Sequence, residues 1–222
     1  MKRYRVWWAL LAAVFALSLA GCRSAPESAS GQPKDASQNG PRTESGQTLR
    51  DGRTLVLYFS RTGEQYTVGV IDRGNTAIVA EMIAEKTGAD LFEIVPADDH
   101  YPMTYSELTD VAKRKQNEGA RPAYKGSLPD LSDYDTVFIG APVWWGDWPM
   151  IMYTVFEHND FSGKKLVPFS THEGSGLSGF DRKLSNACPD SEILTGRAFR
   201  GNDCQNKRDS VQEAVDGWIA GL

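Results

Sequence analysis

The sequence predicts an α/β fold in which helices cover both faces of a five-stranded parallel sheet. Two observations lead to this prediction. From residue 54 to the C-terminus, short apolar runs alternate with segments of helical spacing, which is typical of repeated strand–helix units. The run at residues 136–140 is uncharged and apolar after Thr136, as a central parallel strand buried on both faces should be.

The first half of this alternation begins with a strand at residues 54–59, which is apolar after its first residue. The following helix is expected at residues 76–86, where Ile78, Val79, Met82 and Ile83 have helical spacing. Asn75 suits its N-cap, and Gly88 suits the position after its end. The apolar residues of 91–95 predict the second strand, and a more polar helix is expected at 104–117.

The second half contains three further strands and three further helices. The apolar run at 136–140 is the third strand, and Pro149 favours the first turn of a helix at 149–156. The fourth strand, a short helix, the last strand and a closing amphipathic helix are expected at residues 165–169, 179–186, 192–199 and 208–220.

Residues 1–21 are predicted to be a lipoprotein signal peptide. A basic start from Lys2 to Arg5 precedes an uncharged, mostly apolar run at 6–20, which is too short for a comfortable membrane span. Leu-Ala-Gly before Cys22 resembles a bacterial lipobox, in which the cysteine is lipidated. We therefore expect an exported lipoprotein, anchored to a membrane of the cell envelope. The alternative is an ordinary secretory signal in which Cys22 is incidental.

Residues 22–52 are predicted to be a disordered tether. They are rich in Ser, Gly, Pro and Gln, and Leu49 is their only large apolar residue. Such a segment buries too little apolar surface to offset its chain entropy. Residues 53–222 remain, and they are enough for one domain with a full core.

Charge and cysteine content restrict the function further. The net charge of −5 argues against nucleic acid as a partner. With Cys22 assigned to the lipid, Cys188 and Cys204 are left in an oxidising compartment, where we expect a disulfide between them. Two buried, unpaired thiols are the alternative. The chain has no Cys-x-x-Cys motif, so neither a redox dithiol nor a zinc site is indicated.

The loop after the first strand is a candidate phosphate site. It begins with Ser60, Arg61 and Thr62 and returns at Asn75 and Thr76, where a helix is expected to start. Backbone N–H groups and hydroxyls can converge on an anion there, and the free N–H groups and dipole of the helix favour negative charge. We expect these residues to surround one phosphate, with Arg61 adding charge. The alternative is a plain turn followed by a helix cap.

The loop after the third strand is a candidate platform for a flat ligand. Trp144, Trp145 and Trp148 lie within five residues of one another at the end of a strand. A flat apolar surface contributes most to binding when the ligand is itself flat and aromatic. In the alternative interpretation, these rings fill the core or form a patch that binds a partner.

The loop after the fourth strand, residues 170–179, is rich in Gly and Ser. Gly174, Gly176 and Gly179 have the spacing of the dinucleotide fingerprint. That fingerprint belongs to the first strand–helix turn of its unit, with an acidic residue about 20 positions later, so we reject it here. We expect instead that the backbone of this loop offers hydrogen-bond donors and acceptors to the edge of a ring. His172 is a further candidate hydrogen-bonding group, although a lone loop histidine more often packs or is solvated.

These three loops together resemble a bacterial flavodoxin-like family across residues 53–222. The resemblance rests on residues 58–63, 74–76, 140–146 and 171–176. It implies a three-layer sandwich with strand order 2-1-3-4-5 and non-covalently bound FMN. It places phosphate contacts at Ser60, Thr62, Asn75 and Thr76, and ring contacts at Pro142, Val143, Trp144, Trp145, Gly146, Thr171, Glu173, Gly174 and Gly176.

Two departures from the family pattern bear on function. Residues 64–73 are an insertion relative to short flavodoxins, and typical flavodoxins are cytoplasmic whereas this protein is expected to be exported. The second departure leaves the redox partner open between a protein and a small-molecule electron acceptor.

The function expected from these observations is FMN-dependent electron transfer at the cell envelope. No acid–base residue needs to be essential, so no catalytic residue is named. Gly146 is expected to permit a peptide flip toward the reduced ring, because glycine tolerates positive φ. One alternative is an NAD(P)H-dependent quinone or flavin reductase, although the sequence shows no separate nicotinamide site. Another is a non-redox binding module, whose loops should be degraded rather than intact.

Overall fold

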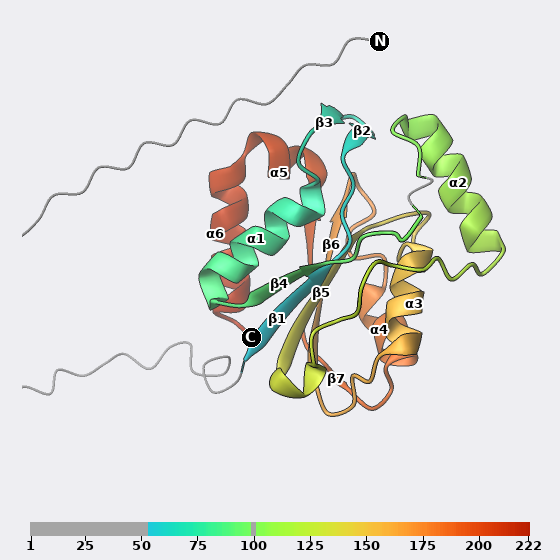
Figure 1. Cartoon of the computed structure of the whole chain (residues 1–222). Coiled ribbons are helices and arrows are strands. Elements are labelled where there is room, and N and C mark those ends of the chain that lie inside the picture. Colours follow the sequence, from blue (N-terminus) through green and yellow to red (C-terminus); the bar gives the residue numbers. More distant parts are fainter. Residues whose placement is uncertain (1–52, 99–100) are drawn as a thin grey trace, which may run out of the picture. The chain divides into compact units, whose positions relative to one another are not determined.

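The central sheet of the protein is parallel, and its strand order is β4-β1-β5-β6-β7, with β8 also paired to β6 (Figure 1). The structure is a computed structural model, and it describes residues 53–98 and 101–222 of the chain. Cys22, the predicted signal peptide and the predicted tether lie outside these residues. The strands are β1 (Thr54–Tyr58), β4 (Asp90–Glu93), β5 (Thr136–Pro142), β6 (Lys165–His172), β7 (Glu192–Ile193) and β8 (Arg197–Arg200). In chain order this is the predicted arrangement 2-1-3-4-5.

The last predicted strand, at 192–199, is divided into β7 and β8. Leu166 of β6 pairs with Ile193, and Phe169 of the same strand pairs with Arg197. Between these two pairs β6 advances by three residues, whereas the neighbouring segment advances by four. That segment therefore contains one extra residue, which forms a bulge. Pro168 lies within this gap and has no N–H to donate to a neighbouring strand. The prediction of one continuous strand is wrong for this reason.

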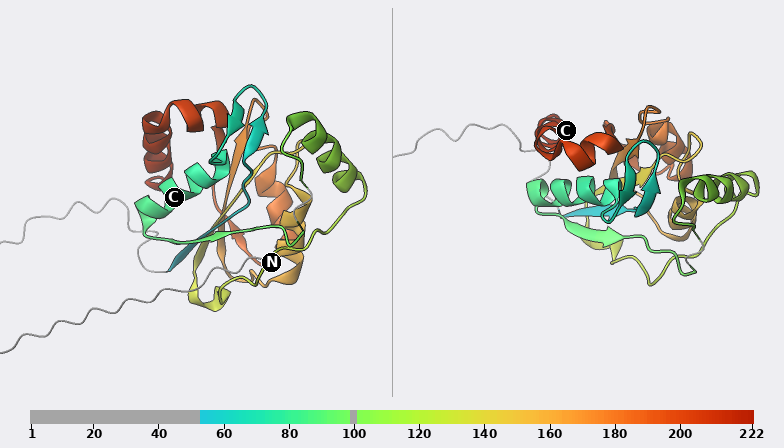
Figure 2. Two further views of the ribbon diagram at one scale, coloured as in Figure 1. Left: turned by 45° about the horizontal axis from the view of Figure 1, so that its top comes forward. Right: turned by 90° about the horizontal axis from the view of Figure 1, so that it is seen from above.

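Helices cover both faces of the sheet, as predicted. Alternate residues of β1 point to opposite sides: Leu55 and Leu57 pack in one buried cluster, and Val56 and Tyr58 pack in the other. Figures 1 and 2 show two groups of helices on either side of the strands. One group contains α1 (Asn75–Thr87), α5 (Gly201–Asn206) and α6 (Arg208–Ile219), and the other contains α2 (Tyr105–Asn117), α3 (Met150–His158) and α4 (Phe180–Ala187).

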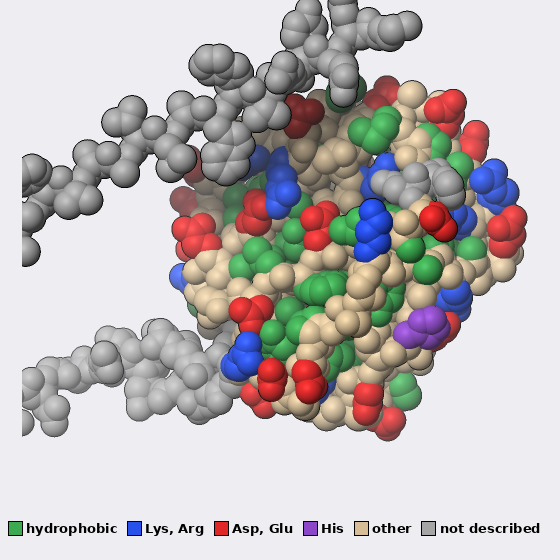
Figure 3. Space-filling model, viewed as in Figure 1, with side chains coloured by type: hydrophobic (Ala, Val, Ile, Leu, Met, Phe, Trp, Pro, Cys, Tyr) green, Lys and Arg blue, Asp and Glu red, His purple; other side chains and the backbone are tan. Residues whose placement is uncertain are grey.

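The edge strand β4 is short and carries a charged residue at each end, Asp90 and Glu93. Arg53 lies 2.8 Å from the Asp90 carboxylate. Figure 3 shows hydrophobic side chains gathered in the middle of the face on which β4 lies in Figure 1, and Leu91 on this strand is exposed. Charge and shortness both discourage another strand from pairing with such an edge. Within the described residues, no helix is long and apolar enough to cross a bilayer.

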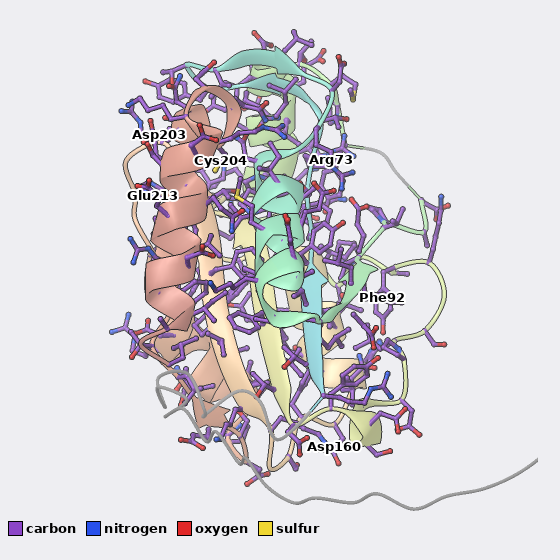
Figure 4. All side chains as sticks on the ribbon, turned by 90° about the vertical axis from the view of Figure 1, so that its left-hand side faces the viewer. Arg73, Phe92, Asp160, Asp203, Cys204 and Glu213 are labelled. Carbon is purple, nitrogen blue, oxygen red and sulfur yellow. The ribbon has the colours of Figure 1, made fainter. Side chains whose placement is uncertain are left out.

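The expected disulfide between Cys188 and Cys204 is wrong, because the sheet lies between the two thiols. Cys188 follows α4 and belongs to the cluster on that face, whereas Cys204 lies on α5 in the opposite cluster. Figure 4 shows Cys204 on the side of α1 and α6. Both cysteines are free and buried, and burial raises the pKa of Cys188 to about 11 and that of Cys204 to about 12. The alternative interpretation, two buried and unpaired thiols, is therefore the correct one.

The insertion at residues 64–73, expected as part of a loop, forms an antiparallel hairpin of β2 (Gly63–Gln65) and β3 (Gly69–Ile71). The hairpin is attached to the start of α2. The Glu64 N–H donates to the Met103 carbonyl at 2.8 Å, and the Glu64 carboxylate accepts from the Tyr105 N–H at 2.8 Å. Because Tyr105 begins α2, Glu64 supplies a distant side-chain cap to that helix.

Candidate functional site

A cavity of about 500 Å³ lies at the carboxyl ends of β1, β5 and β6. Ligands of open parallel sheets bind at this edge, and the volume is within the usual range of ligand pockets. Ten of the predicted cofactor residues line it: Ser60, Arg61, Asn75, Thr76, Pro142, Val143, Trp144, Trp145, Thr171 and Glu173. The other lining residues are Gln65, Tyr66, Tyr105, Leu108, Thr109, Ala112, His172 and Ser175.

One end of the cavity has the features of an anion-binding site. The Ser60 hydroxyl oxygen accepts a hydrogen bond from the Ala77 N–H at 3.1 Å, which leaves the hydroxyl proton for another acceptor. The first N–H groups of α1 have no intrahelical acceptor, and its first turn contains no acidic residue. A negative group at this point would be stabilised by both the free N–H groups and the helix dipole.

Gly74 lets Ser60 and α1 approach this closely. A Cβ at position 74 would lie 2.1 Å from the Ser60 hydroxyl oxygen and 2.6 Å from the Arg61 carbonyl oxygen. Gly74 is also the N-cap residue, so α1 begins at Asn75. The prediction that Asn75 caps the helix is wrong by one position, and Asn75 instead contributes the first helical N–H.

The anion end is braced from two sides. The hydroxyls of Thr76 and Thr171 are hydrogen-bonded at 2.8 Å and buried, which joins the first loop to the third. On the other side, the Gln205 amide on α5 donates to the Asn75 side-chain oxygen at 2.7 Å and to the Arg73 carbonyl at 2.8 Å. We call Ser60, Asn75, Thr76 and the first N–H groups of α1 the anion cradle. These contacts hold the anion cradle in one arrangement.

Arg61 and Thr62, predicted neighbours of the phosphate, differ in their placement. Arg61 lines the cavity, but its guanidinium also donates to the Tyr101 carbonyl at 2.8 Å and lies 5.4 Å from the centre of the Tyr101 ring. Thr62 is exposed and does not line the cavity. The structure therefore brings Arg61, but not Thr62, to the cavity.

The tryptophan loop forms a tight turn from Trp144 to Asp147, with hydrogen bonds in both directions between these two residues. Trp145 and Gly146 at its centre have φ values of +52° and +72°, as in the turns that close hairpins. Trp144 packs edge-on against Phe59, with ring centres 5.5 Å apart. It is half-buried, and part of it faces the cavity.

Trp145 is 53% exposed and leans on α2. Its indole N–H donates to the Thr109 carbonyl at 2.9 Å, and the Lys113 ammonium lies 5.0 Å from its ring centre. Trp148 is different: it is buried and stacks on Phe180 at 3.6 Å. Two of the three tryptophans thus face the cavity, and the third fills the core, as the alternative interpretation has it.

Lys183 on α4 fixes the tryptophan turn to the third loop. Its ammonium donates to the Gly146 carbonyl, to the Ser178 carbonyl at 3.1 Å, and lies 3.2 Å from the Asp147 carboxylate. Gly146 does not line the cavity. A flip of the peptide after Gly146 would have to break the bond to Lys183, so this contact opposes the expected flip.

The third loop contributes fewer contacts than predicted. Gly174 and Gly176 have φ values of +128° and +61°, which only glycine adopts easily, but neither lines the cavity. Glu173 does, although its side chain is only 12% exposed and is already paired. Its carboxylate accepts from Arg200 at 3.0 Å and from the Asn202 N–H at 2.5 Å.

His172 also lines the cavity. Its Nδ1 accepts a hydrogen bond from the Gly174 N–H at 2.8 Å, so the neutral ring carries its proton on Nε2. Burial lowers the pKa of His172, which favours this neutral form. The side chain can therefore donate one hydrogen bond from Nε2.

Sequence reasoning missed the wall that α2 and the hairpin add to the cavity. Leu108 and Ala112 are buried on α2 at helical i, i+4 spacing. That spacing in the sequence could have indicated the buried face of this helix. Tyr66 lies in the insertion, where no pattern in the sequence pointed to a ligand.

Comparison with known proteins agrees with this geometry. The family model described as flavodoxin matches residues 53–217, and no curated protein matches the chain. A crystal structure of a candidate flavoprotein from Bacteroides uniformis is 31% identical, covers 76% of this chain and 97% of its own, and has a TM-score of 0.61. A candidate flavoprotein from Bacteroides eggerthii is 29% identical, with coverages of 72% and 98% and a TM-score of 0.57.

A third crystal structure shares the fold at lower identity. It is a flavoprotein from Lactobacillus acidophilus in complex with FMN, 20% identical, with coverages of 72% and 99% and a TM-score of 0.54. The matched residues 53–217 contain the anion cradle, the tryptophan turn and the third loop. The chain therefore belongs to the flavodoxin family.

Proposed function

We propose that this protein binds FMN without a covalent bond and transfers electrons at the cell envelope. One observation carries the proposal: a single cavity joins an anion cradle at one end to two half-exposed tryptophans at the other. FMN has the same division, with a phosphate at one end and a flat ring system at the other. Family membership and the fold shared with a flavoprotein crystallised with FMN support the same cofactor.

The residues of the cavity divide into two groups by the part of the cofactor they would hold. Ser60, Asn75, Thr76 and the start of α1 would receive the phosphate, with Arg61 nearby. Trp144 and Trp145 would exclude water from the ring, and the His172 Nε2–H could donate to its edge. FMN, when bound, supplies the capacity to accept electrons and release them again.

Location at the envelope is part of the proposal. The lipobox-like Leu-Ala-Gly before Cys22, and the apolar run that precedes it, support export and lipid attachment. Residues 22–52 would then tether the domain to the membrane. The electron-transfer partner would be another envelope protein or a small-molecule acceptor.

A nicotinamide-dependent reductase is the second candidate, and the cavity favours it less. A nicotinamide dinucleotide brings two or more phosphate groups, which are usually met by cationic side chains or a further anion cradle. Among the described residues that line the cavity, Arg61 is the only lysine or arginine, and its guanidinium already donates to the Tyr101 carbonyl. An electron carrier needs no second phosphate site.

The test compares FMN with riboflavin, which has the same ring system but no phosphate. Purified full chain in mild detergent is titrated with each ligand, and quenching of flavin fluorescence is measured. Ser60→Ala removes one donor to a charged phosphate, so FMN affinity should fall about tenfold or more while riboflavin affinity is unchanged. Ser191→Ala is the matched control, because this hydroxyl also makes one hydrogen bond, to the Cys188 carbonyl, and neither residue lines the cavity.

Two results would contradict the proposal. A chain that binds neither flavin has no flavin site. Equal affinities of the unmodified chain for FMN and riboflavin would mean that the cradle does not hold a phosphate.

A further inference from the structure

One wall of the cavity comes from outside the three loops that the flavin assignment uses. Six lining residues belong to the β2–β3 hairpin and to α2: Gln65, Tyr66, Tyr105, Leu108, Thr109 and Ala112. The rings of Tyr66 and Tyr105 stack on each other, with centres 5.4 Å apart and planes 29° apart. We call these six residues the aromatic wall.

The aromatic wall is held together across distant parts of the sequence. Figures 1 and 2 show the hairpin beside the N-terminal end of α2. Glu64 joins the two by its bonds to Met103 and Tyr105. Gly63 at the base of the hairpin has a φ of +87°, and a Cβ there would lie 2.8 Å from the Met103 carbonyl oxygen. Glycine is thus required for the hairpin to approach α2.

The aromatic wall is also continuous with the tryptophan turn. The bond from the Trp145 indole N–H to the Thr109 carbonyl joins that turn to α2. Trp145 and Tyr66 are both more than half exposed, at 53% and 55%. Large aromatic side chains left open beside a cavity are a common mark of a ligand site.

The chemistry of the aromatic wall is uncharged. None of its six residues is a carboxylate, lysine, arginine or histidine. Burial, with the neighbouring Tyr66 as a smaller cause, raises the pKa of the Tyr105 phenol, so that ring stays neutral near pH 7. Leu108 and Ala112 add buried apolar surface. A flat ring stacked on such a wall gains most if it carries no charge to desolvate.

We propose that the aromatic wall binds a planar, uncharged ring compound, of which a quinone is the type, next to the flavin. This inference rests on the proposed function, because the flavin is taken to occupy the anion cradle and the tryptophan turn. It gives the insertion at residues 64–73 a role: the hairpin carries Tyr66 to the cavity. Under this proposal, a small molecule of this class would be the electron acceptor of the reduced flavin.

The test measures binding without turnover. Menadione, an uncharged naphthoquinone, is titrated by calorimetry into full chain loaded with oxidised FMN, which has no electrons to give. Tyr66→Ala should weaken menadione binding about two- to tenfold through loss of one ring contact. Tyr66→Phe keeps the ring and should bind menadione as tightly as the unmodified chain. Val70→Ala, on the same hairpin, 79% exposed and outside the cavity lining, should leave menadione affinity unchanged.

FMN affinity of each variant is measured first, by fluorescence. If Tyr66→Ala weakens FMN binding as much as menadione binding, the aromatic wall holds the flavin itself and the inference is wrong. It is equally wrong if Tyr66→Ala and Tyr105→Leu both leave menadione affinity unchanged, or if anionic nicotinamide mononucleotide binds as tightly as menadione. A chain that does not load FMN overturns the proposed function and this inference together, whereas the other outcomes leave the proposed function standing.

Discussion

The two ends of the cavity are built in different ways. The anion end is fixed by buried or partly buried hydrogen bonds: Ser60 with Ala77, Thr76 with Thr171, and Asn75 with Gln205. At Gly74 there is no space for even one more carbon atom. The aromatic end consists of half-exposed rings on a short hairpin and on the first half of α2.

This difference has a physical reason. A phosphate is recognised by hydrogen bonds, whose strength falls steeply with small errors in distance and angle, so its site must be rigid. A flat ring is held by dispersion and the hydrophobic effect, which tolerate small displacements. We therefore expect changes at the anion end to be more damaging than changes at the aromatic end.

The largest effect is expected at Gly74. Gly74→Ala would place a Cβ 2.1 Å from the Ser60 hydroxyl oxygen, so β1 and α1 would have to move apart. The cost should be about 1–3 kcal/mol in the free energy of unfolding, with loss of most FMN affinity. Urea unfolding and FMN titration measure the two effects.

Gly217→Ala is the matched control for that change. Gly217 lies on α6, and apart from its chain neighbours and the backbone of its own helix no atom lies within 4 Å of an added Cβ. Alanine there should therefore stabilise the helix by up to about 1 kcal/mol. If the two alanines had equal effects on stability and FMN affinity, the anion end would not be as tightly packed as described.

A smaller effect is expected at Glu64, which fixes the aromatic end. Glu64→Ala removes the carboxylate that accepts from the Tyr105 N–H, and should cost about 0.5–1 kcal/mol, because the site is exposed. Near-ultraviolet circular dichroism from the stacked tyrosines should change, while FMN affinity should change little. Glu213→Ala, on the exposed side of α6 (Figure 4), should alter neither, and a large loss of FMN affinity in Glu64→Ala would contradict the division of the cavity.

The smallest effect is expected from His172, which lines the cavity at the end of β6. Burial lowers its pKa in the folded protein, so the unfolded chain, with a His pKa near ~6.5, binds a proton more readily. The free energy of unfolding should therefore decrease as the pH falls below ~6.5 and stop decreasing below the folded pKa.

His172→Gln should lack this part of the pH dependence. Urea unfolding of the flavin-free chain at several pH values between neutral and mildly acidic measures it. An unmodified chain that becomes more stable on acidification over this range, relative to His172→Gln, would show that the folded pKa is raised instead.

Much of the sheet could be predicted because its signals are local. The apolar runs that became β1, β5 and β6 are buried, and burial on both faces is what a continuous apolar run records. The break between β7 and β8 could not be read in the same way, since it depends on Pro168 of the neighbouring strand.

The site was predictable where a loop directly follows a strand. Ser60, Trp144 and Thr171 each lie at or just beyond a strand end, and parallel strands bring such positions to one edge. Gly174 and Gly176 were placed in the site by family pattern, yet they shape the turn without lining the cavity. Tyr66 and Leu108 could not be placed, because they reach the cavity from elements whose position no local signal specifies.

The sequence by itself determined the parallel α/β fold, its strand order through the family it resembles, and the loop residues Ser60, Asn75 and Thr76 that line the cavity. Periodicity and strand-end motifs are local properties of the chain, and the strand-crossover rules convert them into a topology. Only the tertiary structure decided that Cys188 and Cys204 lie on opposite faces of the sheet, that Lys183 holds the Gly146 carbonyl, and that the insertion carries Tyr66 to the cavity. Each of these depends on which distant side chains come into contact, and that is fixed by packing rather than by any stretch of sequence alone.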